Sequence, residues 1–283
     1  MAILVTGARG TIGGRVLARL AASGHRVRGS ARDTAAPGLP PGTETVPLDL
    51  TAPDPAAAER ALQGVRTVFL YPARGRIDGF LGAAVAAGVE HLVLLSSPAS
   101  YLPHEYDGPI GLTHRAIERA VEESGLPHTV LYPSWLATNA ARDWAPQLRA
   151  AGAVALVHPE AQVSPIHPAD IAEVAADLLT SETHRGRLLV LSGPESRSQR
   201  ELVGVLGTLL GRAIPIERLD EDAALQRRPP WLPEPVLRAL LRAEAAAAGL
   251  PAPLTNAVER ITGRPARGFE TWAAENLAAF QVN

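Results

Sequence analysis

A glycine-rich segment near the start of the sequence, residues 5–14 (VTGARGTIGG), constrains the fold more than any other feature. It follows a short apolar run and precedes a helical pattern, which is the strand-turn-helix context in which such glycines bind a dinucleotide. Gly7 permits a tight turn, Gly10 lets a pyrophosphate approach the backbone N–H groups, and Gly13 lets the helix pack closely on the strand. The sequence therefore predicts a dinucleotide site at this turn.

Apolar, β-forming runs alternate with helical patterns through the first half of the sequence. This alternation is typical of parallel strands joined by crossover helices, and continuous apolar runs are typical of strands covered on both faces. The expected strands are residues 2–6, 26–31, 45–48, 67–72, 91–96 and 129–132, and the expected helices are residues 12–22, 55–62, 77–87 and 112–123. Each helix is followed by a glycine that is expected to end it in the left-handed conformation, namely Gly24, Gly64, Gly88 and Gly125.

The predicted fold class is α/β: a doubly wound, mostly parallel Rossmann-type sheet with a smaller C-terminal α+β substrate-binding region. We expect a dinucleotide-binding domain over residues 1–132, to which later segments return further strands, and a mainly helical region over residues 133–283. In the second region, residues 168–180, 199–210 and 268–280 are expected helices, the stretch 244–248 is alanine-rich helix, and residues 188–191 are an expected strand. Asp170 is expected near the positive start of the first of these helices.

The end of the second expected strand bears on which dinucleotide fits. An acidic side chain about 20 positions after the glycines would bind the ribose hydroxyls and repel a 2′-phosphate. Arg32 offers a guanidinium fork suited to phosphate instead, and Arg9 in the turn offers a second cation. The expected cofactor is therefore NADP(H). Asp33 leaves NAD(H) open if the strand ends one residue later, and both arginines could instead be solvated surface residues.

Asp49 and Leu50 follow the third expected strand and are expected against the adenine, with the carboxylate accepting from the exocyclic amine. The alternative for Asp49 is to cap the helix over residues 55–62, although Asp54 is better placed for that.

Composition excludes several kinds of chemistry. The chain contains no cysteine, and all 27 of its basic residues are arginine. The missing lysine excludes Schiff-base catalysis, pyridoxal phosphate attachment and a Walker phosphate loop, and the missing cysteine excludes disulfides and thiolate metal sites. His158, His167 and His184 are too scattered to predict a metal site. A net charge of −2 gives no reason to expect a nucleic-acid partner. Because no leader pattern and no long apolar run is found, we expect a cytoplasmic protein without a membrane partner.

The glycine turn, Arg32 and the Asp49–Leu50 pair resemble the NmrA-like branch of the atypical short-chain dehydrogenase/reductases. The likeness extends over nearly the whole chain, through residues 112–118 (LTHRAIE), 124–133 (SGLPHTVLYP), Asn139, 170–172 (DIA) and 262–269 (TGRPARGF). The branch includes NADPH-dependent quinone, azo and imine reductases as well as regulators without turnover. The resemblance implies NADP(H)-binding roles for Gly7, Arg9, Gly10, Thr11, Ile12, Arg32, Asp49, Leu50, Tyr71, Pro72, Ser96, His114, Tyr132 and Pro133.

The sequence departs from the relatives at the catalytic pair. Short-chain reductases commonly use Tyr-x-x-x-Lys to donate a proton and to hold the nicotinamide ribose, and the matching positions here are Ile110 and His114. Tyr132 also stands where the family usually has arginine. Proton delivery by the usual pair is therefore impossible in this chain.

Other side chains could donate a proton from the loop after the fifth expected strand, where the nicotinamide is expected. Tyr101 and Tyr106 carry phenolic protons, and His104 and His114 titrate near neutral pH. His114 could equally be a packed helix histidine, and the tyrosines could be ordinary loop residues. Trp135, Asn139 and Trp144 are expected to line a cleft for a flat, apolar small-molecule substrate, with a plain core role as the alternative for Trp144.

Three functions remain open from the sequence. The first is an NADPH-dependent reductase of a small conjugated or cationic organic acceptor, of quinone, azo or iminium type, that works without the tyrosine–lysine pair. The others are a catalytically silent NADP(H)-sensing regulator and a non-redox isomerase or cyclase on the same fold.

Overall fold

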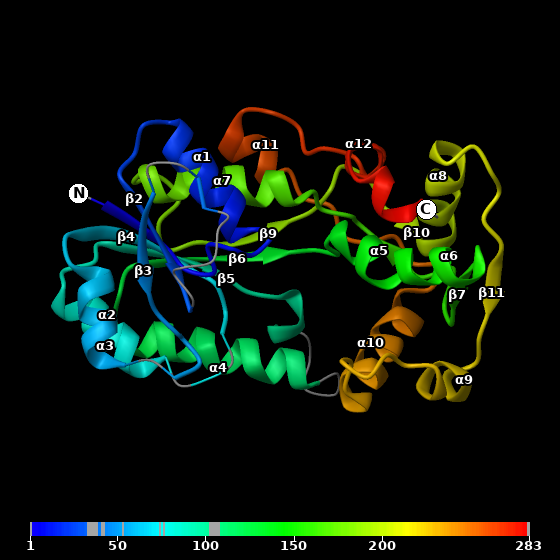
Figure 1. Ribbon diagram of the computed structural model, residues 1–283, viewed down its shortest axis with the longest axis horizontal. Helices are drawn as coiled ribbons and strands as arrows, with labels where there is room; N and C mark the ends of the chain where they lie inside the picture. The colour runs from blue at the N-terminus through cyan, green and yellow to red at the C-terminus, as the bar shows by residue number, and fades with distance from the viewer. Residues whose placement is uncertain are drawn as a thin grey trace. The chain divides into compact units, whose positions relative to one another are not determined.

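The computed structural model describes residues 2–32, 39–40, 43–52, 54–73, 75, 77–101 and 108–281. The chain divides into two compact units, and it passes from one to the other more than once (Figure 1). The first unit consists of Met1–Ser100, Leu112–Pro133 and Pro168–Val190, and the second of Tyr101–Gly111, Ser134–His167 and Leu191–Asn283.

A seven-stranded sheet forms the centre of the fold, in the order β3-β2-β1-β4-β5-β6-β9. The pairs from β3 to β6 are parallel. The N–H of Val130 donates to Arg187 O and the N–H of Ser134 donates to Leu191 O, so β9 runs parallel to β6. The strands are β1 (Ala2–Val5), β2 (Val27–Ala31), β3 (Glu44–Pro47), β4 (Val65–Leu70), β5 (His91–Leu95), β6 (His128–Pro133) and β9 (Leu188–Leu191). The expected doubly wound α/β fold is confirmed, with its switch point between β1 and β4.

The strands of the first unit match the expected ones to within two residues, and the largest difference is at β4. This strand begins at Val65 and ends at Leu70, two residues before the expected end. It ends there because the N–H of Tyr71 donates to the hydroxyl of Thr6 at 2.7 Å and so leaves the ladder. The Thr6 hydroxyl in turn donates to Phe69 O at 3.1 Å.

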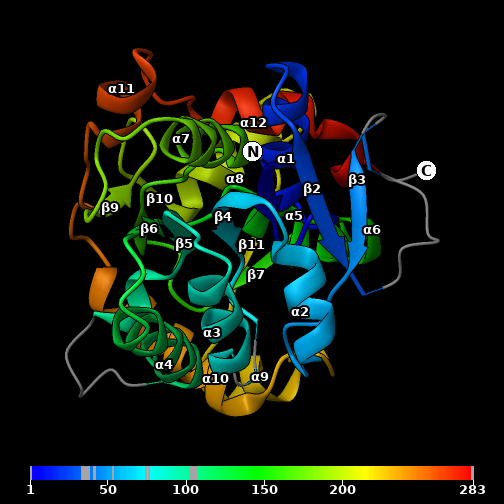
Figure 2. The same ribbon diagram turned by 90° about the vertical axis from the view of Figure 1, so that its left-hand side faces the viewer.

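Helices cover both faces of the sheet in the first unit (Figures 1 and 2). On one face lie α1 (Gly13–Ala22) and α7 (Pro168–Thr180), which pack against each other. On the other lie α2 (Pro55–Leu62), α3 (Asp78–Ala86) and α4 (Pro109–Glu123). The core of this second face is built from apolar side chains of all three helices and of the strands, including Leu4, Val68, Leu92, Leu62, Phe80 and Val121.

The ends of these helices follow local signals in the sequence. Gly24, Gly64, Gly88 and Gly125 all have φ between +69° and +79°, so the expected left-handed stops are confirmed. Asp54 caps α2 by accepting from the N–H groups of Ala56 and Ala57, and Asp170 stands in the first turn of α7, as expected.

A buried arginine in β2 ties three elements together. Arg28 is 5% exposed, and its Nη1 donates to Ala61 O at 2.7 Å and to Gln63 O at 3.0 Å at the end of α2. Its Nη2 lies 2.8 Å from Glu44 Oε1 on β3. The guanidinium therefore satisfies helix carbonyls that have no partner within α2.

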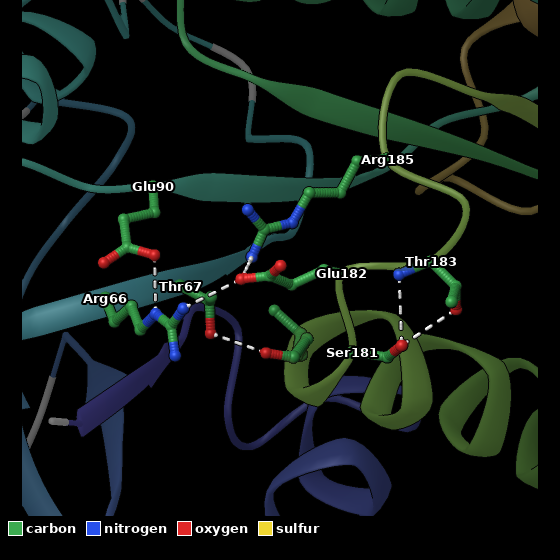
Figure 3. Close-up of polar contacts among 8 residues, drawn as sticks. Arg66, Thr67, Glu90, Ser181, Glu182, Thr183 and Arg185 are labelled. Carbon is green, nitrogen blue, oxygen red and sulfur yellow. Dashed lines mark hydrogen bonds and ion pairs between the residues drawn. The ribbon is translucent and has the colours of Figure 1, made fainter.

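The amino edge of the sheet carries a polar cluster that holds the end of α7 (Figure 3). Arg66 of β4 lies 2.6 Å from Glu90 and 3.2 Å from Glu182, which follows α7. Below these exposed pairs the buried hydroxyl of Thr67 donates to Leu179 O at 3.1 Å. Exposed ion pairs contribute little to stability, so the buried Thr67 bond is the stronger tie.

The second unit combines short helices with two small sheets. Its strands are β7 (Val154–Leu156) with β11 (Ile216–Arg218), and β8 (Gln162–Val163) with β10 (Arg197–Ser198). Its helices are α5 (Thr138–Asp143), α6 (Ala145–Ala151), α8 (Gln199–Leu209), α9 (Glu221–Gln226), α10 (Glu234–Ala247), α11 (Ala257–Thr262) and α12 (Phe269–Glu275). Its core contains Trp144, Leu148, Leu202, Leu206, Phe269, Trp272 and Phe280.

The expected single helix over residues 268–280 is wrong. The structure has α12 over Phe269–Glu275 and then a short 3₁₀ helix over Leu277–Phe280. Asn276 separates them with φ −116° and ψ 17°, and its side-chain amide donates to Trp272 O at 2.8 Å. An asparagine that binds the backbone in this way favours a break over a continuous helix.

Among the helices that the structure describes, none has both the length and the apolar character needed to cross a membrane.

Candidate active site

The glycine turn joins β1 to α1 in a tightly closed loop. Gly7 has φ +62°, and its carbonyl oxygen accepts from the N–H of Gly10 at 2.8 Å. A Cβ on Gly13 would lie 2.3 Å from Gly7 O, so no side chain fits where the helix meets the strand. A Cβ on Gly7 would lie 2.9 Å from the Cβ of Tyr71. The tight turn and the close helix-strand packing expected of Gly7 and Gly13 are both present.

The start of α1 is suited to an anion. Ile12 at its N-cap position makes no side-chain capping bond, and the first turn contains no acidic residue. In contrast, Asp54 caps α2, and Ser198 with Glu201 forms a capping box on α8. Arg9, Gly10 and Thr11 are all exposed in the turn. The N–H of Gly14 donates to Gly10 O, but the positive end of the helix has no side-chain cap, which suits an anionic ligand.

Arg32 and Asp49 lie at neighbouring strand ends, as the sequence predicted. Asp49 accepts from the hydroxyl of Thr51 at 2.6 Å and from its N–H at 2.9 Å. The Thr51 hydroxyl, then the Thr51 N–H and to a smaller extent the charge of Arg32 lower the pKa of Asp49. Since Asp54 caps α2, Asp49 is not needed as a cap. Leu50 is buried in the core of the first unit.

Asp33, the residue that would reverse the cofactor argument, lies outside the described residues.

A polar cluster forms at the carboxyl ends of β5 and β6. Ser96 follows β5 and is 4% exposed, and its hydroxyl donates to Glu118 on α4. The other carboxylate oxygen of Glu118 accepts from the hydroxyl of Tyr132 at 3.1 Å. Nδ1 of His114, one turn before Glu118, lies 3.3 Å from Ser96 Oγ. Four side chains from two strands and one helix therefore share one hydrogen-bond network, here called the β5–α4 cluster.

Burial sets the protonation of the histidine in this cluster. Desolvation lowers the pKa of His114, and the charge of Glu118 opposes that effect without cancelling it. The imidazole is therefore neutral at pH 7.

Sequence reasoning placed Ser96, His114 and Tyr132 in the site but missed Glu118. The spacing of four residues between His114 and Glu118 on one helix could have revealed it, because such residues share a helix face.

The remaining cofactor candidates lie at the same edge of the sheet. Tyr71 is 41% exposed after β4, followed by the half-buried Pro72, and Pro133 is buried at the end of β6. The tip of β4 is joined to the glycine turn through Thr6, whose hydroxyl accepts from the N–H of Tyr71.

The substrate candidates belong to the second unit. The rings of Trp135 and Trp144 lie 5.7 Å apart, and Trp135 lies 6.4 Å from Phe269. Trp144 is 2% exposed and is part of the core of that unit, which fits its core alternative. Asn139 lies in the first turn of α5, where its N–H donates to Leu136 O.

The other expected proton donors belong to the segment that follows β5. Tyr101 is half exposed and belongs to the second unit, and Tyr106 and His104 lie outside the described residues. Across the described ranges, no group of three or more histidine, aspartate or glutamate side chains is arranged to hold a metal ion.

Comparison with known proteins agrees with this geometry. A family described as NAD(P)H-binding matches residues 7–182. A relative from Streptomyces griseus, named (4-alkanoyl-5-oxo-2,5-dihydrofuran-3-yl)methyl phosphate reductase, is 40% identical over 282 residues, which cover 98% of this chain and 99% of the relative. The NAD(P)H azoreductase of Xenophilus azovorans is 32% identical over 289 residues, which cover 98% of this chain and 99% of the relative.

Solved structures show the same fold. The NADPH-dependent quinone oxidoreductase of Escherichia coli, solved in complex with NADPH, superposes with a TM-score of 0.79 at 23% identity, over 98% of this chain and 99% of the other.

The chain belongs to the NAD(P)H-binding family, as the resemblance to the NmrA-like branch predicted. Its class is that of the NAD(P)H-dependent oxidoreductases.

Proposed function

We propose that the chain is an NADPH-dependent reductase that transfers hydride to a small conjugated or cationic organic acceptor without a tyrosine–lysine pair. The observation that carries this proposal is the hydrogen-bond pattern of the β5–α4 cluster, which contains His114, the residue at the position of the lysine of the usual pair.

The cluster favours a holding role for His114 over proton donation. Because the Ser96 hydroxyl gives its hydrogen to Glu118, its oxygen is left to accept from Nδ1 of His114. In that tautomer Nε2 carries a lone pair and can accept from a hydroxyl group. We infer that Nε2 of His114 holds a ribose hydroxyl of the bound nucleotide, and that Ser96 and Glu118 position the ring.

Such a site suits acceptors that need no proton from the protein. The reduced nicotinamide supplies the hydride when it is bound. An iminium carbon becomes a neutral amine on receiving hydride, and a quinone becomes an anion that water protonates. The Streptomyces relative is named for an unsaturated furanone, which is also a conjugated acceptor. The protein's contribution is then to position the acceptor and to stabilise charge.

Three features support NADPH as the cofactor. The uncapped start of α1 would bind the diphosphate, and Arg32 would bind the 2′-phosphate. Asp49 lies next to Arg32 at the adenosine end, where its carboxylate, already bound by Thr51, has a second oxygen to offer.

Loss of NADPH absorbance against a panel of acceptors tests the proposal. The panel contains a quinone, an azo dye, a cyclic iminium ion and an acyl-substituted furanone. We expect oxidation of NADPH by at least one of them. Tight NADPH binding without oxidation by any acceptor would instead support a sensing role, and product formation without NADPH consumption would support an isomerase or cyclase.

Substitution of the histidine separates holding from proton donation. In His114→Gln the amide can still bind a hydroxyl, but less well placed than the imidazole. If His114 only holds the nucleotide, we expect a raised KM for NADPH and a kcat within about tenfold of the unchanged protein. His25→Gln is the matched control, because His25 is exposed at the opposite edge of the sheet. A fall in kcat of about a thousandfold with an unchanged KM would show that His114 donates the proton.

A further inference from the structure

The second unit contains a cavity of about 510 Å³ that no part of the proposed hydride transfer uses. It lies among α5, α6, β7, α8, β11, α9 and α10, and its walls are largely apolar, with Trp144, Leu156, Trp231, Leu232 and Leu241 among them. A volume of this size is within the range of small-molecule sites, roughly 300–1,000 Å³.

Most of the charged groups at the cavity already have a partner in the protein. Arg142 binds Asp143 through two hydrogen bonds of 2.6 and 2.7 Å, and its guanidinium lies 5.7 Å from the centre of the Trp231 ring. Arg227 lies 2.8 Å from one carboxylate oxygen of Glu217 and 2.9 Å from the other. These two arginines are therefore neutralised where they stand.

Glu244 on α10 differs from these groups. Its carboxyl lines the cavity, and its hydrogen-bond partner is the amide of Gln199 on α8. In the described part of the chain, no arginine forms an ion pair with it. Burial raises the pKa of Glu244 to about 7, and the nearby charge of Asp143 adds to that effect. A carboxylate in an apolar cavity without a cation is costly, so a ligand that brings one is favoured.

We propose that this cavity binds a small, mostly apolar ligand that carries a positively charged nitrogen, and that Glu244 is its charge partner. The apolar walls suit the body of such a ligand, and the nitrogen would supply the cation that Glu244 lacks. An anionic ligand would meet both Glu244 and Asp143, and two of the arginines at the cavity, Arg142 and Arg227, are already paired. The proposal concerns binding alone and holds whether or not the chain reduces the ligand.

Calorimetry without nucleotide tests the proposal with two probes that share an aromatic body. Naphthylmethyl-trimethylammonium is a permanent cation and naphthylmethanol is neutral. At about pH 8 we expect the cation to bind about tenfold more tightly than the alcohol. In Glu244→Gln, which keeps a partner for Gln199, this preference should disappear. The control Glu259→Gln makes the same change of charge on an exposed residue outside the cavity and should keep it.

The pH dependence gives a second readout. With a pKa of about 7, roughly one Glu244 in ten is ionised at about pH 6, and since the charge itself is expected to contribute about tenfold, the cation should bind about fivefold more weakly there than at full ionisation. The other charged groups at the cavity are Asp143, Glu217, Arg142, Arg227 and Arg228. Naphthylmethanol should bind equally at both pH values.

A cavity-filling variant tests whether the two probes bind in this cavity. Ala224 of α9 lines the cavity, and Ala224→Trp should abolish binding of both probes while the thermal transition shows that the unit still folds. Equal affinity for the two probes in the unchanged protein would overturn the proposal. So would a preference for the cation that survives Glu244→Gln or Ala224→Trp.

Discussion

Arg32 is the residue on which the choice between NADPH and NADH depends. It is exposed directly after β2, and its charge reaches Asp49 at the neighbouring strand end. If it binds the 2′-phosphate, Arg32→Ala should weaken NADPH about 10- to 100-fold and NADH hardly at all, as calorimetry with each nucleotide would show. Arg26→Ala, at the other end of β2, is the control and should change neither. Equal weakening of both nucleotides would remove the 2′-phosphate argument.

His91 makes the stability of the first unit depend on pH. It is fully buried in β5, its Nε2 lies 3.0 Å from the Thr129 hydroxyl, and burial, followed by the charge of Arg185, lowers its pKa from 6.5 to about 4. A lowered histidine pKa means that the unfolded chain takes up the proton first. The stability that neutral His91 contributes to the fold is therefore complete above pH 6.5 and is lost as the pH falls to about 4.

We expect this group to remove about 3 kcal/mol from the free energy of unfolding over that pH range. Urea denaturation at a series of pH values measures the effect. His91→Gln keeps a partner for Thr129 but does not titrate, so the fall in stability should be shallower than in the unchanged protein. Parallel curves for the two proteins would show that His91 is not the titrating group.

At the scale of elements, the cap of α2 gives a test of local stability. Asp54 accepts from the N–H groups of Ala56 and Ala57 at 3.3 and 3.2 Å. Asp54→Ala should lower the free energy of unfolding by about 1 kcal/mol, and Asp54→Asn should retain most of it, because asparagine also caps helices. Denaturant melts of the two variants make the comparison. If Asp49→Ala lowered the free energy of unfolding more than Asp54→Ala does, the cap of α2 would be Asp49 and not Asp54.

The elements that could be predicted from the sequence are those whose signals are local. The cap of α2, the glycine stops and the apolar strands each depend on residues within one or two turns of chain. The structural role of Arg28 has no such signal, because the carbonyls that it binds belong to α2, more than thirty residues later. The break at Asn276 was missed because the apolar pattern continues across it.

The same division applies to the site. The glycine turn and Arg32 follow from spacing along the chain, and their placement could be predicted. The contact of Ser96 with Glu118 depends on how α4 packs against β5, which a single sequence does not encode in any short pattern. The cavity at Glu244 is built from seven elements of the second unit, and an alanine-rich helix gives no sign of it.

At the scale of the whole molecule, the chain contains two cores rather than one. Local patterns predict that residues 168–180 form a helix, yet they do not say which core the helix joins. In the structure α7 packs on α1, β4 and β5 of the first unit, although the segment before it, Ser134–His167, belongs to the second. The residues proposed to bind NADPH all belong to the first unit, so its stability should respond to the nucleotide.

Hydrogen exchange with and without NADPH tests this expectation. At about a hundred times its Kd, NADPH should stabilise the first unit by about 3 kcal/mol and slow its best-protected amides about a hundredfold. These amides are expected in β1 and α1, around Leu4 and Val16, which are fully buried. Adenosine, which lacks the diphosphate, is the control and should not slow them. If amides around Leu202 and Trp272 are slowed by the same factor, the two cores unfold in one step, whereas unchanged exchange around Leu4 would contradict NADPH binding to the first unit.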